Sequence, residues 1–288
     1  MSQGHKHNKL IMAEVRRPEF PVIAGYRFIQ PIARSAHAAL YLAHSAELNQ
    51  DVAIKVLRNS DRRALTQEQI QRFERERELL MRVKHRSVVD LYDWGRTSDQ
   101  NGESHYLVTE YFPAGSLELR IRNLISVRDS VDFFLQICGA LVAIHRTGLC
   151  HRDLKPANVM LRQDGSVVLI DFGLAMTLEN TSLTGIGEVF GSPYYISPEQ
   201  IDGSSSGDHR SDLYSLGILF HELLTGARPF QGKTIIEIAQ AHRQAPIPAL
   251  PEALAKFQPL VTGLLEKDPA QRVQSASDAL AMMARLKV

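Results

Sequence analysis

The stretch His151-Arg152-Asp153-Leu154-Lys155-Pro156-Ala157-Asn158 is followed, thirteen residues after its end, by Asp171-Phe172-Gly173. Between them lie two short apolar runs separated by the turn Asp164-Gly165, a pattern that predicts a β-hairpin. Folded antiparallel, the hairpin returns Asp171 to the level of Asn158, so that an oxygen atom from each can bind one hard cation. Asp153 stands a few residues away, without a metal to hold. Two Mg²⁺ ligands and a separate base indicate phosphoryl transfer.

This block resembles the catalytic loop and metal-binding triplet of eukaryotic-type serine/threonine protein kinases, in their bacterial branch, and the resemblance covers residues 26–288. It implies that Asp153 accepts the proton of the substrate hydroxyl and that Lys155 neutralises the transferring phosphoryl group of ATP. It also implies that Asn158 and Asp171 hold Mg²⁺, with Mn²⁺ as an alternative metal. The Lys-Pro that follows Asp-Leu resembles serine/threonine kinases rather than tyrosine kinases.

Composition narrows the class of protein. The chain has 288 residues, ordinary apolar and charged fractions, and a net charge of +1, which creates no field that would attract nucleic acid or an anionic membrane. Its two cysteines cannot build a disulfide framework, so we expect reduced thiols and a cytoplasmic location, with Cys150 in a buried strand-like segment. No apolar run is long enough for a membrane span or a signal peptide. We expect the partners to be protein substrates and do not expect nucleic acid to bind. The oligomeric state is left open.

The hydrophobic pattern predicts an α+β, bilobal, protein-kinase-like fold. Residues 1–25 are expected to form an irregular extension, residues 26–112 a β-rich N-lobe with one main helix, and residues 113–288 a helical C-lobe. Thr66 and Gln69 fit a capping box at the start of the main helix. Trp94 is expected in the core. Helical periodicity recurs at 65–83, 131–146, 212–224, 235–244, 257–265 and 276–286. A cleft between the lobes is where a ligand is expected to bind.

Helix geometry predicts one ion pair at the nucleotide site. Lys55 ends the alternating strand Val52-Ala53-Ile54-Lys55, and the resemblance implies that it reaches the α- and β-phosphates of ATP. Glu76 lies on the same apolar stripe as Phe73 and Leu80, and a carboxylate that faces the core needs a cation. Lys55 is therefore its expected partner. The alternative is that Glu76 is one more charge on a solvated helix.

The adenine site is assigned from the resemblance alone. It implies that Leu40 and Ala53 lie above the adenine and Met160 below it, and that the backbone of Glu110 and Phe112 hydrogen-bonds it. It also places Thr109 at the rear of the pocket. A stack of side chains that joins the two lobes would consist of Leu80, Leu91, His151 and Phe172.

One departure from the family pattern concerns the loop that covers the phosphates. Ala33, Ser35 and Ala38 stand where the family has glycines, which approach phosphates closely and adopt positive φ. We expect a stiffer loop with a weaker grip on ATP. The departure raises the alternative of a pseudokinase scaffold with weak nucleotide binding, although the intact set Lys55, Asp153, Asn158 and Asp171 favours an active enzyme. A further alternative keeps the fold but phosphorylates a small-molecule hydroxyl.

The segment from Asp171 to Glu199 resembles an activation segment, which speaks against a small-molecule acceptor. Ser192 is expected to contact Asp153 and Lys155, and Glu199 to pair with Arg272. Asp212 is expected to hold the backbone of the catalytic loop. We expect autophosphorylation in this segment, because Arg152 would pair with the new phosphate. The candidate hydroxyls are those of Thr184, Thr181 and Ser182.

Overall fold

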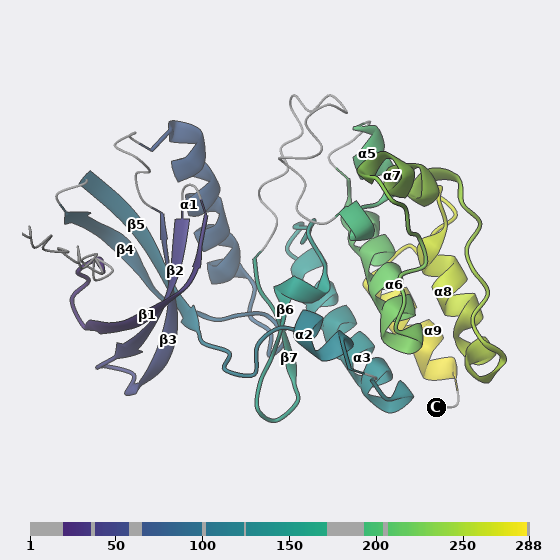
Figure 1. The fold of residues 1–288 in the computed structure, drawn as a ribbon, viewed down its shortest axis with the longest axis horizontal. Coiled ribbons are helices and arrows are strands. Elements are labelled where there is room, and N and C mark those ends of the chain that lie inside the picture. The colour runs from purple at the N-terminus through teal and green to yellow at the C-terminus, as the bar shows by residue number, and fades with distance from the viewer. Residues whose placement is uncertain are drawn as a thin grey trace, which may run out of the picture.

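The computed structural model describes residues 20–35, 38–57, 65–99, 102–123, 125–171, 193–203 and 207–286. Within these ranges, an antiparallel sheet with one long helix stands beside a helical region, and a short hairpin lies between the two (Figure 1). This is the bilobal α+β arrangement predicted from the sequence. The predicted lobe boundary between residues 112 and 113 falls between the last strand of the sheet and the first helix of the second lobe, and it remains a proposal.

The N-lobe sheet has the strand order β1-β2-β3-β5-β4. Its strands are β1 (Tyr26–Arg34), β2 (Ala38–Ser45), β3 (Gln50–Leu57), β4 (Leu91–Asp99) and β5 (Gly102–Glu110). One face carries a small apolar core that includes Tyr41, Ile54 and Val108. Ile23 joins this core from the segment before β1, and the ring of Phe20 stacks on Phe28 at 5.9 Å. The end of the predicted irregular extension therefore packs against the sheet.

Helix α1 (Gln67–Arg82) is the main helix of the N-lobe. It begins with the predicted capping box, in which Thr66 Oγ1 accepts from the Gln69 backbone N–H at 3.3 Å. The Gln69 side chain accepts in return from the Thr66 backbone N–H at 2.9 Å. This reciprocal pair satisfies two backbone donors that the first turn leaves without partners. The buried stripe of α1, which includes Phe73 and Leu80, packs toward the sheet and turns Glu76 toward β3.

The C-lobe is built around α6 (His209–Thr225), in which every residue from Ser211 to Leu224 is buried. Helices α3 and α8 pack against it, and a Cβ added at Gly217 would lie 2.8 Å from the Leu264 Cβ. A helix buried on all sides must pair its polar groups internally. The other C-lobe helices are α2 (Leu117–Ile121), α3 (Val127–His145), α5 (Pro198–Asp202), α7 (Ile235–Gln244), α8 (Gln258–Leu265) and α9 (Ala276–Arg285). Short 3₁₀ turns are η1 (Pro156–Asn158), η3 (Pro193–Tyr195) and η4 (Glu252–Phe257).

The hairpin predicted from the catalytic stretch is present. Strand β6 (Val159–Leu161) pairs antiparallel with β7 (Val167–Leu169), with Val159 opposite Leu169. Gly165 makes the turn at φ 82°, a conformation that glycine adopts without strain. Beyond the strands, the Ile170 N–H donates to the Asn158 carbonyl at 3.0 Å. This register returns Asp171 beside Asn158, as the sequence predicted.

Two single-residue predictions are wrong. Trp94 is 46% exposed rather than buried in the core, and it lies on β4, which is the edge strand of the sheet. The guanidinium of Arg77 covers part of its ring, 4.2 Å from the ring centroid. Cys150 is half-buried in a segment without strand structure, since the chain here turns into the catalytic loop. In the part of the chain that the structure describes, no helix is both long and apolar enough for a bilayer crossing.

Candidate active site

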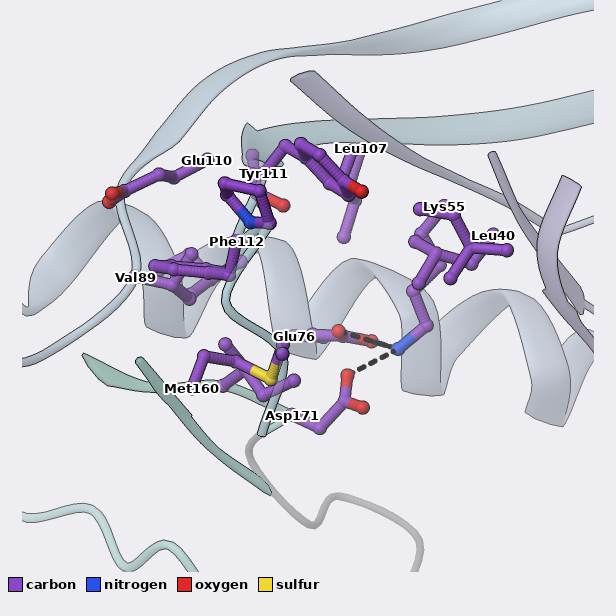
Figure 2. Close-up of a pocket in the computed structure, with 17 residues that line it drawn as sticks. Leu40, Lys55, Glu76, Val89, Leu107, Glu110, Tyr111, Phe112, Met160 and Asp171 are labelled. Carbon is purple, nitrogen blue, oxygen red and sulfur yellow. Dashed lines mark hydrogen bonds and ion pairs between the residues drawn. The ribbon is translucent and has the colours of Figure 1, made fainter. Parts of the chain in front are cut away.

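A cavity of about 290 Å³ separates the N-lobe sheet from the β6–β7 hairpin (Figure 2). Its walls are apolar over most of their area, and one end carries the charged side chains of Lys55, Glu76 and Asp171. The lining includes every residue that the sequence assigned to this pocket, namely Leu40, Ala53, Thr109, Glu110, Phe112 and Met160. Sequence reasoning missed the lining residues Ile32, Val89, Leu107, Tyr111 and Ile170, which read only as ordinary core or strand positions. The cavity suits a ligand that has a flat apolar part and a charged end, with the charged end toward Lys55.

The charged end is a three-residue network. Lys55 Nζ, from β3, donates to Glu76 Oε1 at 2.7 Å and to Oε2 at 2.9 Å. It also donates to Asp171 Oδ1 at 3.1 Å. Only 13% of the Glu76 side chain is exposed, so the alternative in which Glu76 is a solvated surface charge is wrong. Helix α1 directs the Glu76 carboxylate toward the core, as the apolar stripe predicted.

Burial and the neighbouring charges shift the pKa values of all three groups. Burial alone lowers the pKa of Lys55, but the carboxylates of Glu76 and Asp171 outweigh it and raise that pKa above its ordinary value. Burial raises the pKa of Asp171, but the Lys55 ammonium outweighs it and holds that pKa below its ordinary value. One cation therefore faces two carboxyl groups. Burial also raises the pKa of Glu76 above its ordinary value, although the Lys55 ammonium opposes this shift.

The catalytic loop orients Asp153 with two donors. Asp153 Oδ2 accepts from Lys155 Nζ at 2.7 Å and from Asn158 Nδ2 at 2.9 Å. Asn158 Nδ2 also donates to the Asp153 carbonyl at 2.8 Å, which holds the two residues in one compact turn. The Asp153 side chain is nevertheless 41% exposed, so a hydroxyl group from outside can reach it. A carboxylate held in this way is positioned for general-base chemistry.

The donor atoms beside the cavity fit a hard divalent cation. The amide nitrogen of Asn158 is used by Asp153, which leaves its carbonyl oxygen, and Asp171 Oδ1 is used by Lys55, which leaves Oδ2. Carboxylate and amide oxygens are ligands that Mg²⁺ prefers, and Mg²⁺ usually completes its shell with water and phosphate oxygens. In the described ranges no group of three or more His, Cys, Asp or Glu residues is arranged to hold a metal by itself. The site therefore suits a cation that arrives with a phosphate ligand.

Asp212 of α6 accepts hydrogen bonds from the backbone of the catalytic loop, as predicted. Its Oδ2 accepts from the His151 N–H at 2.8 Å, and its Oδ1 accepts from the Arg152 N–H at 2.7 Å. Arg152 has a φ of 64°, a left-handed conformation that is costly for a residue with a Cβ and needs such support. His145 Nε2, at 2.8 Å from Asp212 Oδ2, is a third partner that sequence reasoning missed. Nothing in the sequence links positions 145 and 212.

This arrangement predicts how stability depends on pH. Burial raises the pKa of Asp212, but the hydrogen bond and charge of His145 outweigh it and hold that pKa below its ordinary value of 3.8. The carboxylate therefore stabilises the fold above its unfolded-state pKa, and the contribution is lost as pH falls through the lower, folded-state pKa. Below about pH 4 we expect the Asp212 carboxyl group to make the free energy of unfolding fall more steeply as the pH decreases, by at most about 1.4 kcal/mol per pH unit.

Urea unfolding between about pH 6 and pH 3 measures this contribution. The Asp212→Asn variant should be less stable than the wild type at neutral pH and should lose stability less steeply in acid. Asp132→Asn, which removes an exposed carboxylate from α3, is the matched control and should follow the wild type. Parallel curves for wild type and Asp212→Asn would contradict the prediction.

The segment predicted to cover the phosphates lacks glycines and forms an antiparallel strand pair, with register shifts between Phe28 and Gln30 and between Pro31 and Ala33. Ala33 lies opposite Leu40 in the β1–β2 ladder. The Ser35 N–H donates to the Ala38 carbonyl at 2.8 Å, and the Ala38 N–H donates to Ser35 Oγ at 3.1 Å. In the described chain, the non-glycine residues with positive φ do not include these three positions, so this conformation does not require glycine there. The expected weaker grip on ATP remains a prediction.

Glu110, the last residue of β5, forms an ion pair that the sequence did not predict. Arg162, at the end of β6, donates to both carboxylate oxygens of Glu110, from Nε at 2.7 Å and from Nη2 at 2.6 Å. Its Nη1 also donates to the Arg86 carbonyl at 2.7 Å. The Glu110 carboxylate points away from the charged end of the cavity (Figure 2). Only the backbone of Glu110 is therefore left to face a ligand.

The predictions for the activation segment divide in two. Phe172, Ser192 and the candidate hydroxyls of Thr181, Ser182 and Thr184 lie outside the described residues. The predicted link at the end of the segment is present: Arg272 donates from Nη1 to Glu199 Oε1 at 2.7 Å and from Nη2 to Oε2 at 2.9 Å.

A β-rich lobe and a helical lobe bring three features to one cleft: a lysine–glutamate pair, an aspartate suited to bind a metal, and an oriented base. This combination defines a phosphoryl-transfer fold. Residues 26–283 match the family model described as the protein kinase domain, and the chain therefore belongs to the protein kinase family. This match agrees with the resemblance carried by the catalytic stretch.

Three of the curated proteins similar to this chain come from bacteria. The chain is 33% identical to the serine/threonine-protein kinase PrkC of Bacillus subtilis over 259 residues, which cover 88% of this chain and 39% of PrkC. It is 34% identical to PknL of Mycobacterium tuberculosis over 287 residues, 96% of this chain and 69% of PknL. It is 34% identical to PknB of Mycolicibacterium smegmatis over 255 residues, 86% of this chain and 40% of PknB. The chain thus spans well under half the length of PrkC and PknB.

Proposed function

We propose that this protein kinase transfers the γ-phosphoryl group of ATP to serine or threonine hydroxyls of proteins, and that it phosphorylates its own activation segment. The observation that carries the proposal is the convergence of Lys55 and Asp171 at 3.1 Å at the end of an apolar cavity, with Asp153 oriented beside it. The printed names of PrkC, PknL and PknB, all serine/threonine-protein kinases, support the choice of acceptor.

Each group has a defined part in this proposal. The adenine would lie between Leu40 and Ala53 on one side and Met160 on the other, with its phosphates toward Lys55. A divalent cation held by Asn158 and Asp171 would supply neutralisation of the phosphate charge. Asp153 would take the proton of the acceptor hydroxyl as the oxygen attacks the γ-phosphorus, and the leaving group would be ADP. Lys155, now 2.7 Å from Asp153 Oδ2, is near enough to neutralise the transferring group.

The pseudokinase alternative has no support among the described contacts. An inactive scaffold would be expected to lose one of the charged groups, whereas Lys55, Glu76 and Asp171 form one network here. The loss of glycines in the phosphate-covering loop is the remaining argument for weak nucleotide binding. A small-molecule acceptor is a separate outcome that the choice of acceptor in an assay distinguishes.

The test is a transfer assay with radiolabelled ATP, Mg²⁺ or Mn²⁺, and a generic protein acceptor such as casein. We expect label in the acceptor as phosphoserine or phosphothreonine, and mass spectrometry of the kinase itself should locate phosphate between residues 177 and 192. Absence of label in any protein with either metal would contradict the proposed activity. Label in casein without phosphate in the kinase would contradict only the autophosphorylation.

A further inference from the structure

A second cavity, of about 390 Å³, is lined in part by Lys155, Pro156 and Ala157 of the catalytic loop. It lies between the loop, helix α2, the 3₁₀ turn η3 and the C-terminal end of α6. Its charged and polar lining consists of Glu118, Arg122, Lys155, Tyr195, Glu222 and Arg228. None of the nucleotide-site roles described above uses Tyr195, Glu222 or Arg228.

This cavity is adjacent to the point of phosphoryl transfer. Lys155 lines it, and the Nζ atom of the same residue lies 2.7 Å from Asp153 Oδ2. A polypeptide whose hydroxyl reaches Asp153 therefore passes beside the cavity. An extended chain advances about 3.3 Å per residue, so the side chains within about three residues of the acceptor are the candidates to enter it.

The buried carboxylate in this cavity is already paired within the protein. Glu222 is buried; its Oε2 accepts from the Tyr195 hydroxyl and its Oε1 from Arg228 Nε at 3.2 Å. Burial and the nearby Glu222 charge raise the pKa of Tyr195, so this phenol stays protonated and continues to donate. Glu222 therefore needs no cation from a bound peptide.

Arg228 occupies the place beside Glu222 that a basic substrate side chain would need. Its guanidinium lies 3.9 Å from the Tyr194 ring centroid, which holds the planar group in place, and its side chain is 33% exposed. Arg228 contacts Glu222 through Nε and also interacts with Tyr195, and a guanidinium has five N–H donors in all. The lining also contains Glu118 and Arg122, which are four residues apart in the sequence and carry opposite charges.

We propose that this cavity binds an acidic side chain of the acceptor protein, close in sequence to the phosphorylated residue, and that Arg228 determines this preference. The inference rests on the function proposed above. Of the cations in the lining, Lys155 is paired with Asp153, while Arg228 lies beside the buried Glu222, whose charge Arg228 and Tyr195 already satisfy. A lysine or arginine side chain here would meet a guanidinium of like charge, while a carboxylate would gain a charge-assisted hydrogen bond.

The experiment compares kcat/KM for synthetic peptides that each contain one threonine. Asp, Ala or Lys is placed in turn at each of the three positions on either side of the threonine. For the wild type we expect at least one position where Asp is preferred over Lys by about tenfold or more. Arg228→Gln should abolish or reverse this preference, because Glu222 then lacks its arginine. Arg285→Gln, which removes an exposed arginine at the end of α9, is the control and should keep the preference.

The outcomes separate this inference from the proposed function. If the wild type phosphorylates no peptide and no protein, the proposed function fails. If it phosphorylates peptides equally well with Asp and Lys at all six positions, this inference fails alone. Arg228→Lys keeps the charge and should keep the preference for Asp; if Arg228→Lys and Arg228→Gln lose it equally, the charge of Arg228 is not its cause. An unchanged melting temperature and KM for ATP would show that each variant is folded.

Discussion

Replacement of Asp153 by asparagine is expected to lower kcat for phosphoryl transfer by about 10²- to 10⁴-fold, the usual contribution of a general base. The asparagine side chain fills the same space but cannot accept the proton of an acceptor hydroxyl. Asp153 contacts Lys155 and Asn158 in the catalytic loop and is not among the residues that line the nucleotide cavity. The KM for ATP should therefore stay close to that of the wild type.

Initial rates at varied ATP and saturating acceptor separate the two parameters. Asp132→Asn removes an exposed carboxylate elsewhere in the C-lobe and should behave as the wild type. A parallel loss of nucleotide binding in Asp153→Asn would point to a folding defect, which fluorescence-detected binding of an ATP analogue would reveal. Transfer that survives the substitution at near wild-type rate would rule out Asp153 as the base.

Replacement of Arg272 by alanine is expected to lower the free energy of unfolding by about 3–5 kcal/mol, the usual cost of breaking a buried ion pair. Arg272 is 2% exposed and forms a bidentate pair with Glu199 at 2.7 and 2.9 Å. Its guanidinium also donates to the carbonyl groups of Arg210 at 2.7 Å and Glu266 at 3.0 Å. The alanine variant leaves a carboxylate and buried carbonyl groups without their donors, which is why the effect exceeds that of a surface pair.

Chemical denaturation measures this loss, and the chain supplies a matched comparison. Arg96 pairs with Glu103 at 3.4 Å, but both side chains are more than half exposed, so Arg96→Ala should cost only about 0–1 kcal/mol. An Arg272→Ala variant as stable as Arg96→Ala would show that the Glu199–Arg272 link is not important for stability. The end of the activation segment would then need another anchor.

The fold and the charged core of the site were largely predictable, because their signals are local. The β6–β7 hairpin follows from two apolar runs and an Asp-Gly turn, and its register returns Asp171 to Asn158 without any long-range information. The inward position of Glu76 follows from the spacing of apolar residues along one helix. Its pairing with Lys55 follows because a carboxylate facing the core needs a cation.

Other contacts were not predictable, because they join residues distant in the chain without a shared pattern. Glu110 and Arg162 are 52 positions apart, and His145 and Asp212 are 67 positions apart. Trp94 was misassigned because an aromatic residue in a strand is usually buried, and only the sheet order shows that β4 is an edge.

The sequence by itself determined the elements, the order of the two lobes and the identity of the charged groups that meet in the cleft. Hydrogen-bonded turns, caps and periodicity act between residues a few positions apart, so they can be read along the chain. The tertiary structure decided which of several charges pair, as for Glu222 with Arg228 rather than with a ligand. Desolvation is the reason: packing around α6 removes water from Glu222 and Asp212, and each must then bind whichever donors the neighbouring elements bring within reach.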